Sequence, residues 1–493
     1  MKDICFELSV GVYWAIMPAK PFYITTTLPY VNAEPHIGFA MEIIRADIIA
    51  RYKRLLGYDV FFNTGTDEHG QKIYQQTLEK GVAPQVYVDE YAEKFHALII
   101  PLGISEVNFI RTTDPAHVAA ARAFWKLVNK NGYIYKKVYK IKYCAGCELE
   151  KTESELENGR CPIHPNREIE LRDEENYYFK FSAFEEKLLQ LYAANPDFVL
   201  PHSRLGEIRA FVSRGLEDFS ISRLKEKMSW GVPVPNDDSQ VMYVWFDALV
   251  NYISAVGWPS DMEKFQKWWV ETGGVVQYCG KDNLRQQSAM WQAMLMSAGI
   301  PPSKQIIING FITSGGQKMS KSTGNVISPF DIVEKYGTDT LRYFVAREIT
   351  TFEDFDVTPE RIKEAYNANL ANGLGNLASR IIKMAEDQLI VGSCKLLEEI
   401  PEEIKKTLEK YEIQKAMDYI WERIQKLDRR IQETEPYRMV KTEPEKGKQI
   451  IGELVSELFI IAHCLEPFLP ETAEKIKEAI RANKKPENLF VRK

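Results

Sequence analysis

Two lysines and three hydroxyl side chains stand close together in the stretch GGQKMSKSTGN, residues 315–325. Glycines flank them, and no helical or strand period of apolar residues accounts for the composition, so we expect a loop. The whole chain has a net charge of −6, so a polyanionic ligand would have to be met by a local group of cations such as this one. The alternative is a basic loop that contacts only solvent.

Metal-ligating residues occur in two close pairs, Cys144-x2-Cys147 and Cys161-x2-His164. Three thiolates and one imidazole form a tetrahedral ligand set for zinc, and four protein ligands leave no open position, which indicates a structural site. The surrounding segment is polar and has little apolar periodicity, so a metal would stabilise it. The alternative is four incidental residues in a turn-rich loop.

The remaining cysteines are scattered along the chain, at Cys5, Cys279, Cys394 and Cys464. This pattern is not typical of a disulfide framework and indicates a reducing compartment. The chain has no run of about eighteen uncharged apolar residues, which a membrane span would need. We therefore expect a cytoplasmic protein. The first residues contain only Lys2 as a cation and are interrupted by Asp3 and Glu7, so we interpret them as an extension, with Met17 as an alternative start.

A strand–helix–strand pattern follows, and its helix would begin beside a histidine. FYITTT (22–27) and DVFFNT (59–64) are strand-like, and apolar residues recur between them at helical spacing: Met41, Ile44, Ile48, Tyr52 and Leu55. Gly57 is a plausible stop. The N–H groups at a helix start bind phosphate; His36 could donate to it, and Gly38 would let a base or ribose approach. The alternative is a surface histidine that caps a helix.

The HIG motif after the first strand, together with KMSKS in the glycine-flanked loop, resembles the signature pair of the class I aminoacyl-tRNA synthetases. In that family the two elements grip ATP from two sides. The resemblance implies catalytic roles for His36, Lys318 and Lys321, with Lys321 stabilising charge between the α-phosphate and the departing pyrophosphate. It implies an ATP site, with Mg²⁺ accompanying the nucleotide, made of His36, Gly38, Gly280, Asp282, Gly310, Lys318 and Lys321.

Several stretches resemble the methionine-activating members of this class: TTLPYVNAEPHIG, FNTGTDEHGQK, YVWFDALVNYIS, YCGKDN, KMSKSTGN and GNLASR. The resemblance implies a methionine pocket made of Leu28 through its backbone, Tyr30, Asp67, Trp245, Ala248, Tyr252 and Gln287. Aromatic rings suit the methionine sulfur, and the Asp67 carboxylate suits the substrate ammonium. Alternatively, Trp245 and Tyr252 are plain core, since YVWF also has a strand pattern, and Asp67 caps a turn.

The sequence departs from the family pattern at three positions. Phe39 replaces the second histidine of the HIGH motif and cannot bind phosphate, so His36 and the loop lysines would have a larger share of that work. Gln287 stands where the family often has a histidine, and its amide keeps a hydrogen-bonding group without titration. Leu249 stands where some relatives have proline. These differences concern rate and selectivity.

The C-terminal part has long helical patterns that resemble the anticodon-binding bundle of the family. Asn376 and Arg380 are four residues apart and would share one helix face. The resemblance implies that they read anticodon bases, and that Tyr437 takes the place of an aromatic residue on which an unstacked base lies. The alternative is a plain helical bundle in which Asn376 and Arg380 cap and cover apolar surface.

The predicted fold is α/β: a doubly wound (Rossmann-type) parallel sheet with an inserted zinc-knuckle domain, followed by an all-α helical bundle. We expect these parts: an extension (1–20), the first half of the catalytic domain (21–135), the insertion (136–225), the second half with the KMSKS loop (226–335), a stem-contact region (336–366) and the anticodon-binding bundle (367–493). VVQYCG and QIIING are the last expected sheet strands. The chain ends soon after the bundle, so we expect a monomer.

The resemblance implies a ligase that activates methionine with ATP and transfers it to the 3′ end of tRNA(Met) for protein synthesis. One alternative is the same chemistry with another amino acid. Trp245 and the short insertion disfavour valine, isoleucine and leucine, whose enzymes usually carry a large editing domain, and a zinc knuckle outside the active site disfavours cysteine. A second alternative is a non-catalytic RNA-binding paralogue, which His36, Asp67 and Lys321 argue against.

Overall fold

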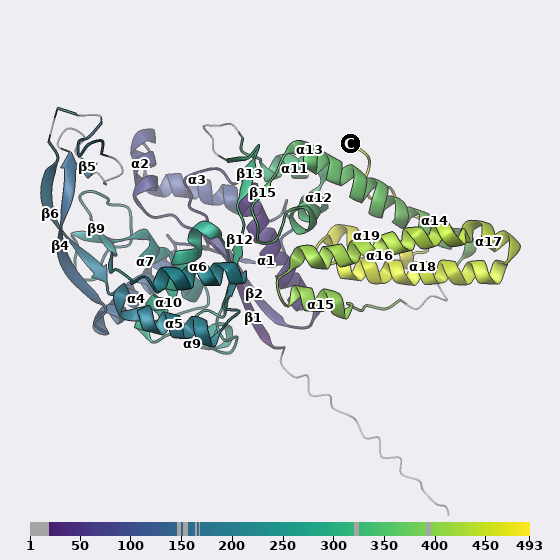
Figure 1. Cartoon of the computed structure of the whole chain (residues 1–493), viewed down its shortest axis with the longest axis horizontal. Helices are drawn as coiled ribbons and strands as arrows, with labels where there is room; N and C mark the ends of the chain where they lie inside the picture. The colour runs from purple at the N-terminus through teal and green to yellow at the C-terminus, as the bar shows by residue number, and fades with distance from the viewer. Residues whose placement is uncertain are drawn as a thin grey trace, which may run out of the picture.

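The computed structural model describes residues 19–144, 149–150, 156–162, 165–166, 168–319, 325–390 and 396–493. Figure 1 shows an elongated molecule with an α/β part, a long β-arm on one side of it and a helical bundle on the other. Within the described residues, no helix is both long and apolar enough to span a membrane.

A six-stranded parallel sheet forms the centre of the α/β part, so the predicted parallel sheet is confirmed. In spatial order the strands are β3 (Asn108–Arg111), β2 (Asp59–Thr66), β1 (Pro21–Thr26), β11 (Val276–Gly280), β12 (Gln305–Asn309) and β7 (Val199–Leu200). The two strands expected from FYITTT and DVFFNT and the two late strands are therefore correct. The chain runs outward from β1 through β2 to β3 on one side and from β11 to β12 on the other, where β7 is the edge strand. The order therefore reverses between β1 and β11, where doubly wound sheets bind ligands.

Alternate side chains of β1 enter two different hydrophobic cores, because successive residues of a strand point to opposite faces. Phe22 and Ile24 join a core that contains helix α1 (Ile37–Leu55) and the C-terminal helices. Tyr23 joins the other core, with helices α4 (Pro115–Lys130) and α10 (Trp291–Ala298). Helix α1 has the predicted start and end.

The remaining helices of the α/β part are short. They are α2 (Gln71–Lys80), α3 (Pro84–His96), α5 (Glu185–Ala194), α6 (His202–Val212), α7 (Val244–Ala248), α8 (Asn251–Ser254), α9 (Met262–Phe265), α11 (Pro329–Tyr336) and α12 (Thr338–Tyr343). The small strands β13 (Ile312–Ser314), β14 (Gln317–Lys318) and β15 (Phe355–Asp356) form a separate sheet at the base of the KMSKS stretch.

The β-arm is the projecting part of an antiparallel sheet in the order β5–β4–β6–β8. Its strands are β4 (Ile134–Cys144), β5 (Leu149–Glu150), β6 (Glu170–Phe179) and β8 (Phe219–Ser220), and the antiparallel pair β9 (Ser222–Leu224) and β10 (Gln240–Met242) follows. Strands β4 and β6 pair from Ile134↔Phe179 to Tyr143↔Glu170, which carries the arm away from the main sheet (Figure 1).

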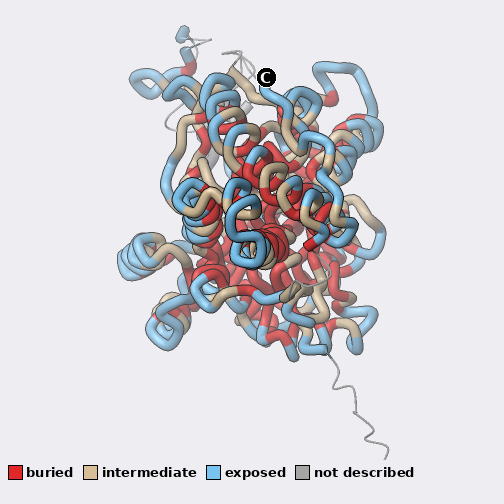
Figure 2. The backbone as a smooth tube through the Cα atoms, turned by 90° about the vertical axis from the view of Figure 1, so that its right-hand side faces the viewer, coloured by how far each residue is buried: buried red, intermediate tan, exposed pale blue. Residues whose placement is uncertain are grey.

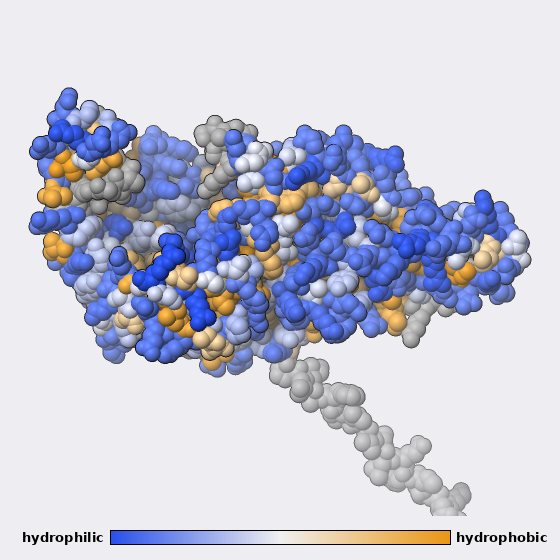
Figure 3. Space-filling model, viewed as in Figure 1, coloured by the Kyte–Doolittle hydropathy of each residue, from blue (hydrophilic) through white to orange (hydrophobic). Residues whose placement is uncertain are grey.

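The C-terminal helices form the predicted bundle. They are α14 (Asn376–Gln388), α15 (Glu402–Leu408), α16 (Ile413–Thr434), α17 (Pro436–Thr442), α18 (Pro444–Leu465) and α19 (Pro470–Arg481). Helix α13 (Pro359–Ala365) and a π-helical segment, Tyr366–Gly375, lead into α14. Buried residues lie on the inward faces of these helices and exposed residues outside (Figure 2), and the outer surface is mainly hydrophilic (Figure 3).

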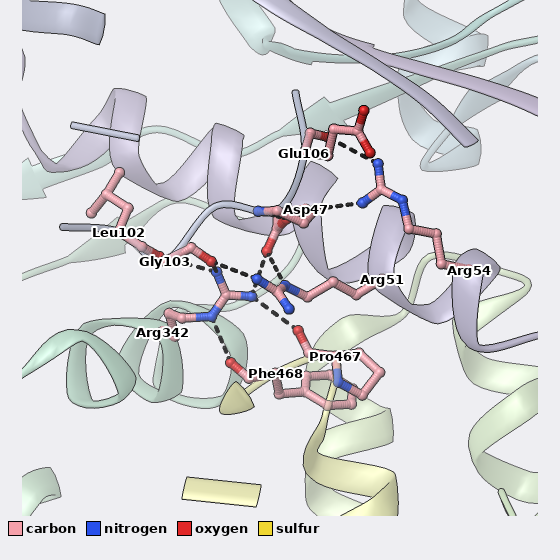
Figure 4. Close-up of polar contacts among 10 residues, drawn as sticks. Asp47, Arg51, Arg54, Leu102, Gly103, Glu106, Arg342, Pro467 and Phe468 are labelled. Atoms are coloured by element: carbon pink, nitrogen blue, oxygen red, sulfur yellow. Dashed lines mark hydrogen bonds and ion pairs between the residues drawn. The ribbon is translucent and has the colours of Figure 1, made fainter. Parts of the chain in front are cut away.

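A buried arginine, paired with an aspartate of the α/β part, joins that part to the bundle (Figure 4). Arg342 of α12 and Asp47 of α1 are completely buried, and their Nη2 and Oδ2 atoms are 2.7 Å apart. Arg342 also donates to the carbonyl oxygens of Pro467 and Phe468, which precede α19, and of Leu102. Burial alone would raise the pKa of Asp47, but Arg342 and a second arginine lower it below its ordinary value. One guanidinium therefore connects three segments that are distant in the sequence.

Candidate active site

A cavity of about 970 Å³ lies at the carboxyl ends of β1 and β11, beside the start of α1. Most of the predicted methionine and nucleotide residues line it: Leu28, Tyr30, His36, Gly38, Asp67, Trp245, Ala248, Tyr252, Gly280, Asp282, Gln287 and Gly310. The side chain of Lys318, in β14, and all of Lys321 lie outside what the structure describes. The sheet topology thus brings together residues that the sequence separates by more than two hundred positions.

His36 caps the start of α1 at the cavity. Its Nδ1 accepts a hydrogen bond from the backbone N–H of Gly38 at 3.0 Å, so the proton of a neutral ring is on Nε2, which becomes the donor. A side chain at position 38 would bring its Cβ within 2.8 Å of the His36 ring, so the ring would have to move. The helix start and the imidazole together suit an anionic group.

Phe39 lines the cavity but belongs to an apolar cluster. Its ring meets that of Phe95 edge to face, with centroids 5.1 Å apart. The residue that replaces the second HIGH histidine therefore packs in the wall beside the nucleotide end.

Asp67 is a buried carboxylate in the cavity wall. Its backbone N–H donates to the carbonyl of Pro29 at 2.9 Å and its carbonyl accepts from Val31 at 3.1 Å, which holds it beside Tyr30. Its Oδ1 is buried and has no hydrogen-bond partner among the described residues. Burial, followed by the nearby carboxylates of Asp247 and Glu68, raises its pKa well above the ordinary value. A cation from a ligand would both satisfy this oxygen and favour its charged form.

The aromatic wall comes from two short helices. Val244–Ala248 is helical, so the alternative of a strand at YVWF is wrong. Trp245 is 36% exposed and is not a core residue, whereas Tyr252 of α8 is buried. Beside Val244, Gly70 has φ +112°, in the region that favours glycine, and a Cβ there would lie 2.8 Å from the hydroxyl of Tyr30.

Gln287 holds Tyr252 in place. Its Nε2 donates to the Tyr252 hydroxyl at 2.8 Å, and its Oε1 accepts from Nε2 of Gln277 at 2.8 Å. All three side chains are buried. The amide that replaces the family histidine is thus a fixed link between the sheet and the pocket.

At the nucleotide end of the cavity, backbone segments lie close to one another. Gly310 follows β12, and a Cβ there would lie 2.0 Å from the carbonyl oxygen of Glu353, so only glycine fits. Glu42 of α1 accepts from the backbone N–H of Thr27 at 2.7 Å, and burial raises its pKa to about 8. Gly280 and Asp282 line the same end of the cavity.

Sequence reasoning missed four charged residues of the cavity wall, Arg223, Glu34, Glu42 and Lys72. The Arg223 guanidinium lies 4.4 Å from the Tyr243 ring centroid and donates to the carbonyl of Ser222 at 2.7 Å. A single cation carries no spacing signal, so only the fold could assign it to this site.

The proposed zinc ligands are described only in part. Cys144 ends β4, and Cys161 is completely buried although Arg160 and Pro162 beside it are exposed. Cys147 and His164 lie outside the described residues. A buried thiol in an otherwise polar, exposed segment fits a soft metal ligand.

A second cleft, of about 800 Å³, lies in the helical part, and Asn376, Arg380 and Tyr437 all line it. Arg380 pairs with Asp428, Nη1 to Oδ1, at 2.7 Å, and both are partly exposed. Tyr437 is 44% exposed and follows Glu435, whose φ of +39° turns the chain between α16 and α17. Sequence reasoning missed the C-terminal segment, which supplies Lys485, Asn488 and Arg492 to the wall and which no motif marks.

Comparison with known proteins gives one consistent family. The family model described as "tRNA synthetases class I (M)" matches residues 22–166 and 146–382. A methionine–tRNA ligase of Fusobacterium nucleatum is 39% identical over 95% of this chain and 76% of its own length. One from Rickettsia felis is 38% identical over 95% and 93%. The structure of Mycobacterium tuberculosis methionyl-tRNA synthetase bound by methionyl-adenylate superposes with a TM-score of 0.83, at 36% identity and 93% coverage of both chains. The chain belongs to the methionyl-tRNA synthetases of class I.

Proposed function

We propose that this protein joins methionine to tRNA(Met) in two steps. The methionine carboxylate attacks the α-phosphate of ATP, and pyrophosphate leaves, which gives methionyl-adenylate. A hydroxyl of the terminal tRNA ribose then attacks the acyl carbon, and AMP leaves. The observation that carries the proposal is the buried Asp67 oxygen in a partly aromatic cavity beside the start of α1.

The methionine ammonium would bind Asp67, because an ionic hydrogen bond satisfies its buried oxygen. The thioether would lie against the rings of Tyr30, Trp245 and Tyr252, since sulfur–aromatic contacts are favourable. Gln287 would keep the Tyr252 hydroxyl fixed. We assign the backbone of Leu28 and the side of Ala248 to the same pocket, which they line.

ATP would occupy the other end of the cavity, with its phosphates toward His36 and the start of α1. Gly38, Gly280, Asp282 and Gly310 would contact the nucleoside part. Lys318 and Lys321 would stabilise the charge that develops on the phosphates, and Mg²⁺ would neutralise part of it. The strand pair β13–β14 supports this role, because Met319, which directly follows β14, forms part of the cavity wall.

Amino-acid-dependent exchange of pyrophosphate into ATP tests the activation step directly. We expect exchange with methionine and at least about 100-fold less with each of the other nineteen amino acids, as differential binding of a side chain allows. Exchange that depended on a different amino acid would refute the methionine assignment. A protein that bound tRNA without any exchange would be the RNA-binding paralogue instead.

We further propose one structural zinc ion held by Cys144, Cys147, Cys161 and His164. The burial of Cys161 in a polar segment supports it. The ion would order the tip of the β-arm, because such a segment has little core of its own. Metal analysis of protein purified without chelator should give one zinc per chain, and Cys161→Ser should lose it while pyrophosphate exchange persists.

Asn376, Arg380 and Tyr437 would read the anticodon in the second cleft. Their grouping around one cleft of about 800 Å³ supports this, since single-stranded loops are read by stacking and by hydrogen bonds to base edges. We assign residues 336–366 to the acceptor-stem side and 367–493 to the anticodon side. A cytoplasmic location and a monomeric state stay predictions, which fractionation of cells and light scattering would test.

A further inference from the structure

We propose that His69, Asp247 and His117 form a positioning cluster that sets the width of the methionine pocket. The inference rests on the proposed function of this cavity. It concerns residues behind the pocket wall: none of the three is among the described residues that line the cavity. They would act on the substrate through their neighbours in the chain.

The geometry is a carboxylate held between two imidazoles. Asp247 Oδ2 is 2.6 Å from Nδ1 of His69, and its Oδ1 is 2.9 Å from Nε2 of His117. The other nitrogen of His117 lies 2.9 Å from the hydroxyl of Ser254 in α8. Burial alone would raise the pKa of Asp247, but His69 and His117 outweigh it and lower the pKa to about 2. The carboxylate therefore accepts a hydrogen bond from each ring.

All three side chains are withdrawn from solvent, so these hydrogen bonds do not compete with water. Asp247 is completely buried, and His69 and His117 are 5% and 1% exposed. The ring of His69 also lies 5.4 Å from that of Trp230, whose Nε1 donates to the carbonyl of Glu68 at 2.6 Å. Contacts of this kind fix side-chain positions, because a buried charge without partners is very unfavourable.

The cluster joins the two walls of the pocket. His69 comes two residues after Asp67, the proposed ammonium ligand. Asp247 stands in α7 between Trp245 and Ala248, on the aromatic wall. His117, from α4, holds Asp247 from behind and also contacts α8, which carries Tyr252. The distance between the ammonium ligand and the aromatic wall is thus determined by two hydrogen bonds to one carboxylate.

Asp247→Asn tests this, because the amide oxygen can accept from one imidazole but the amide nitrogen cannot accept from the other. We expect the KM for methionine in pyrophosphate exchange to rise about 10- to 100-fold, the effect of a displacement near 1 Å, with the KM for ATP nearly unchanged. We also expect weaker discrimination against ethionine, which is longer by one methylene. Loss of folded protein alone would not raise the KM for methionine while leaving the KM for ATP unchanged.

Paired variants provide rescue and keep the test independent of one substitution. His117→Gln keeps a donor near the Nε2 position, so its KM for methionine should stay near the wild-type value. His117→Leu has no such donor, and its KM for methionine should rise. Asp197→Asn is the matched control, because it alters a histidine–aspartate contact, with His202, that is exposed on the surface. Its kinetic constants should equal those of the wild type.

Equal changes in both KM values, or unchanged KM values with a lower melting temperature, would overturn the proposal and leave the cluster as core only. The same holds if His117→Gln and His117→Leu behave alike. Failure of the wild-type protein to exchange pyrophosphate with methionine would instead overturn the proposed function. The two failures are therefore distinguishable.

Discussion

The two ends of this molecule hold their candidate ligand-binding groups in opposite ways. At the methionine end, Asp67 is only 9% exposed and Tyr252 only 1%, and each is fixed by contacts from other segments of the chain. At the RNA end, Tyr437 is 44% exposed, and its neighbours pair with carboxylates of the same bundle. A small substrate is selected by a rigid, dry pocket. Unstacked bases need rings and amides that they can reach from solvent.

This contrast has a consequence for mutation. Changes at the buried end should alter both stability and chemistry, because the groups there have no water to replace a lost partner. Changes at the exposed end should alter RNA selectivity with little effect on folding or on adenylate formation. Four predictions test this contrast, from the largest expected effect to the smallest.

The largest effect is expected at the joint between the two ends. Arg342→Met leaves Asp47 as a buried charge without its main partner, so the free energy of unfolding should fall by about 3–5 kcal/mol. Because the folded pKa of Asp47 is below its ordinary value of 3.8, its stabilising contribution is fully present above that pH and is lost as the pH falls through the folded pKa. Urea unfolding at pH 7 and at lower pH measures both effects.

Arg481→Met is the control for the joint. This arginine meets Glu398 at 3.2 Å on the surface, where an ion pair contributes less than about 1 kcal/mol. If the two variants lost equal stability, the buried joint would not be the connection that we describe.

The next effect concerns the ammonium ligand. Asp67→Asn removes the charge that would meet the substrate ammonium. The kcat/KM for methionine should therefore fall roughly 30- to 5,000-fold, which corresponds to a loss of about 2–5 kcal/mol of transition-state stabilisation. The KM for ATP should change little, because the nucleotide binds the other end of the cavity. Pyrophosphate exchange with each substrate varied in turn measures the two constants. A fall in ATP affinity of the same size would show that Asp67 acts on both ends.

Lys321→Ala should slow adenylate formation by about 100- to 1,000-fold while methionine binding persists, the usual result of removing one preorganised electrostatic donor. Single-turnover formation of methionyl-adenylate gives the rate, and equilibrium binding of methionine is its control. A near-normal rate would mean that this lysine does not contact the phosphates in the transition state.

The smallest effect is expected at the RNA end. Tyr437→Ala should weaken tRNA charging about five- to 150-fold, because one stacked base contributes roughly 1–3 kcal/mol. Methionine-dependent pyrophosphate exchange should stay close to wild type, since no residue of the second cleft lines the first. Charging of tRNA(Met) and of a tRNA with an altered anticodon measures the discrimination.

Arg380→Ala sharpens the same test. A similar loss is expected if the guanidinium reads a base edge, and a smaller one with a changed salt dependence if it meets phosphate. Unchanged discrimination in both variants, together with a lower melting temperature, would make the cleft a feature of a plain bundle.

Local patterns in the sequence determined much of this fold. The β-branched and aromatic runs FYITTT and DVFFNT became β1 and β2, and the helical spacing between them became α1, because period and composition act over a few residues. The same is true of the bundle, where apolar positions recur along α16 and α18. The resemblance of several stretches to the family led to the predicted residues that line the first cavity.

Other features could not be found without the tertiary structure. YVWF has the pattern of a strand, yet Val244 begins a helix whose Asp247 is bonded to His69 and to His117 of α4. Tertiary contacts of this kind outweigh local propensity. Arg223 enters the cavity as a single cation with no motif, and the short edge strand β7 has no strand signal of its own.

Asp247 shows most clearly the difference between what the sequence determined and what the tertiary structure alone supplied. The sequence determined that an acidic residue stands two positions after Trp245, but nothing local distinguishes it from a helix-capping aspartate. Only the fold brings it to His69 and His117, which are 178 and 130 positions away in the chain. Spacing along a chain encodes which groups share a face of one helix or strand. Which groups meet across a core is decided by packing between segments, and there the free energy of burying a charge depends on its partners.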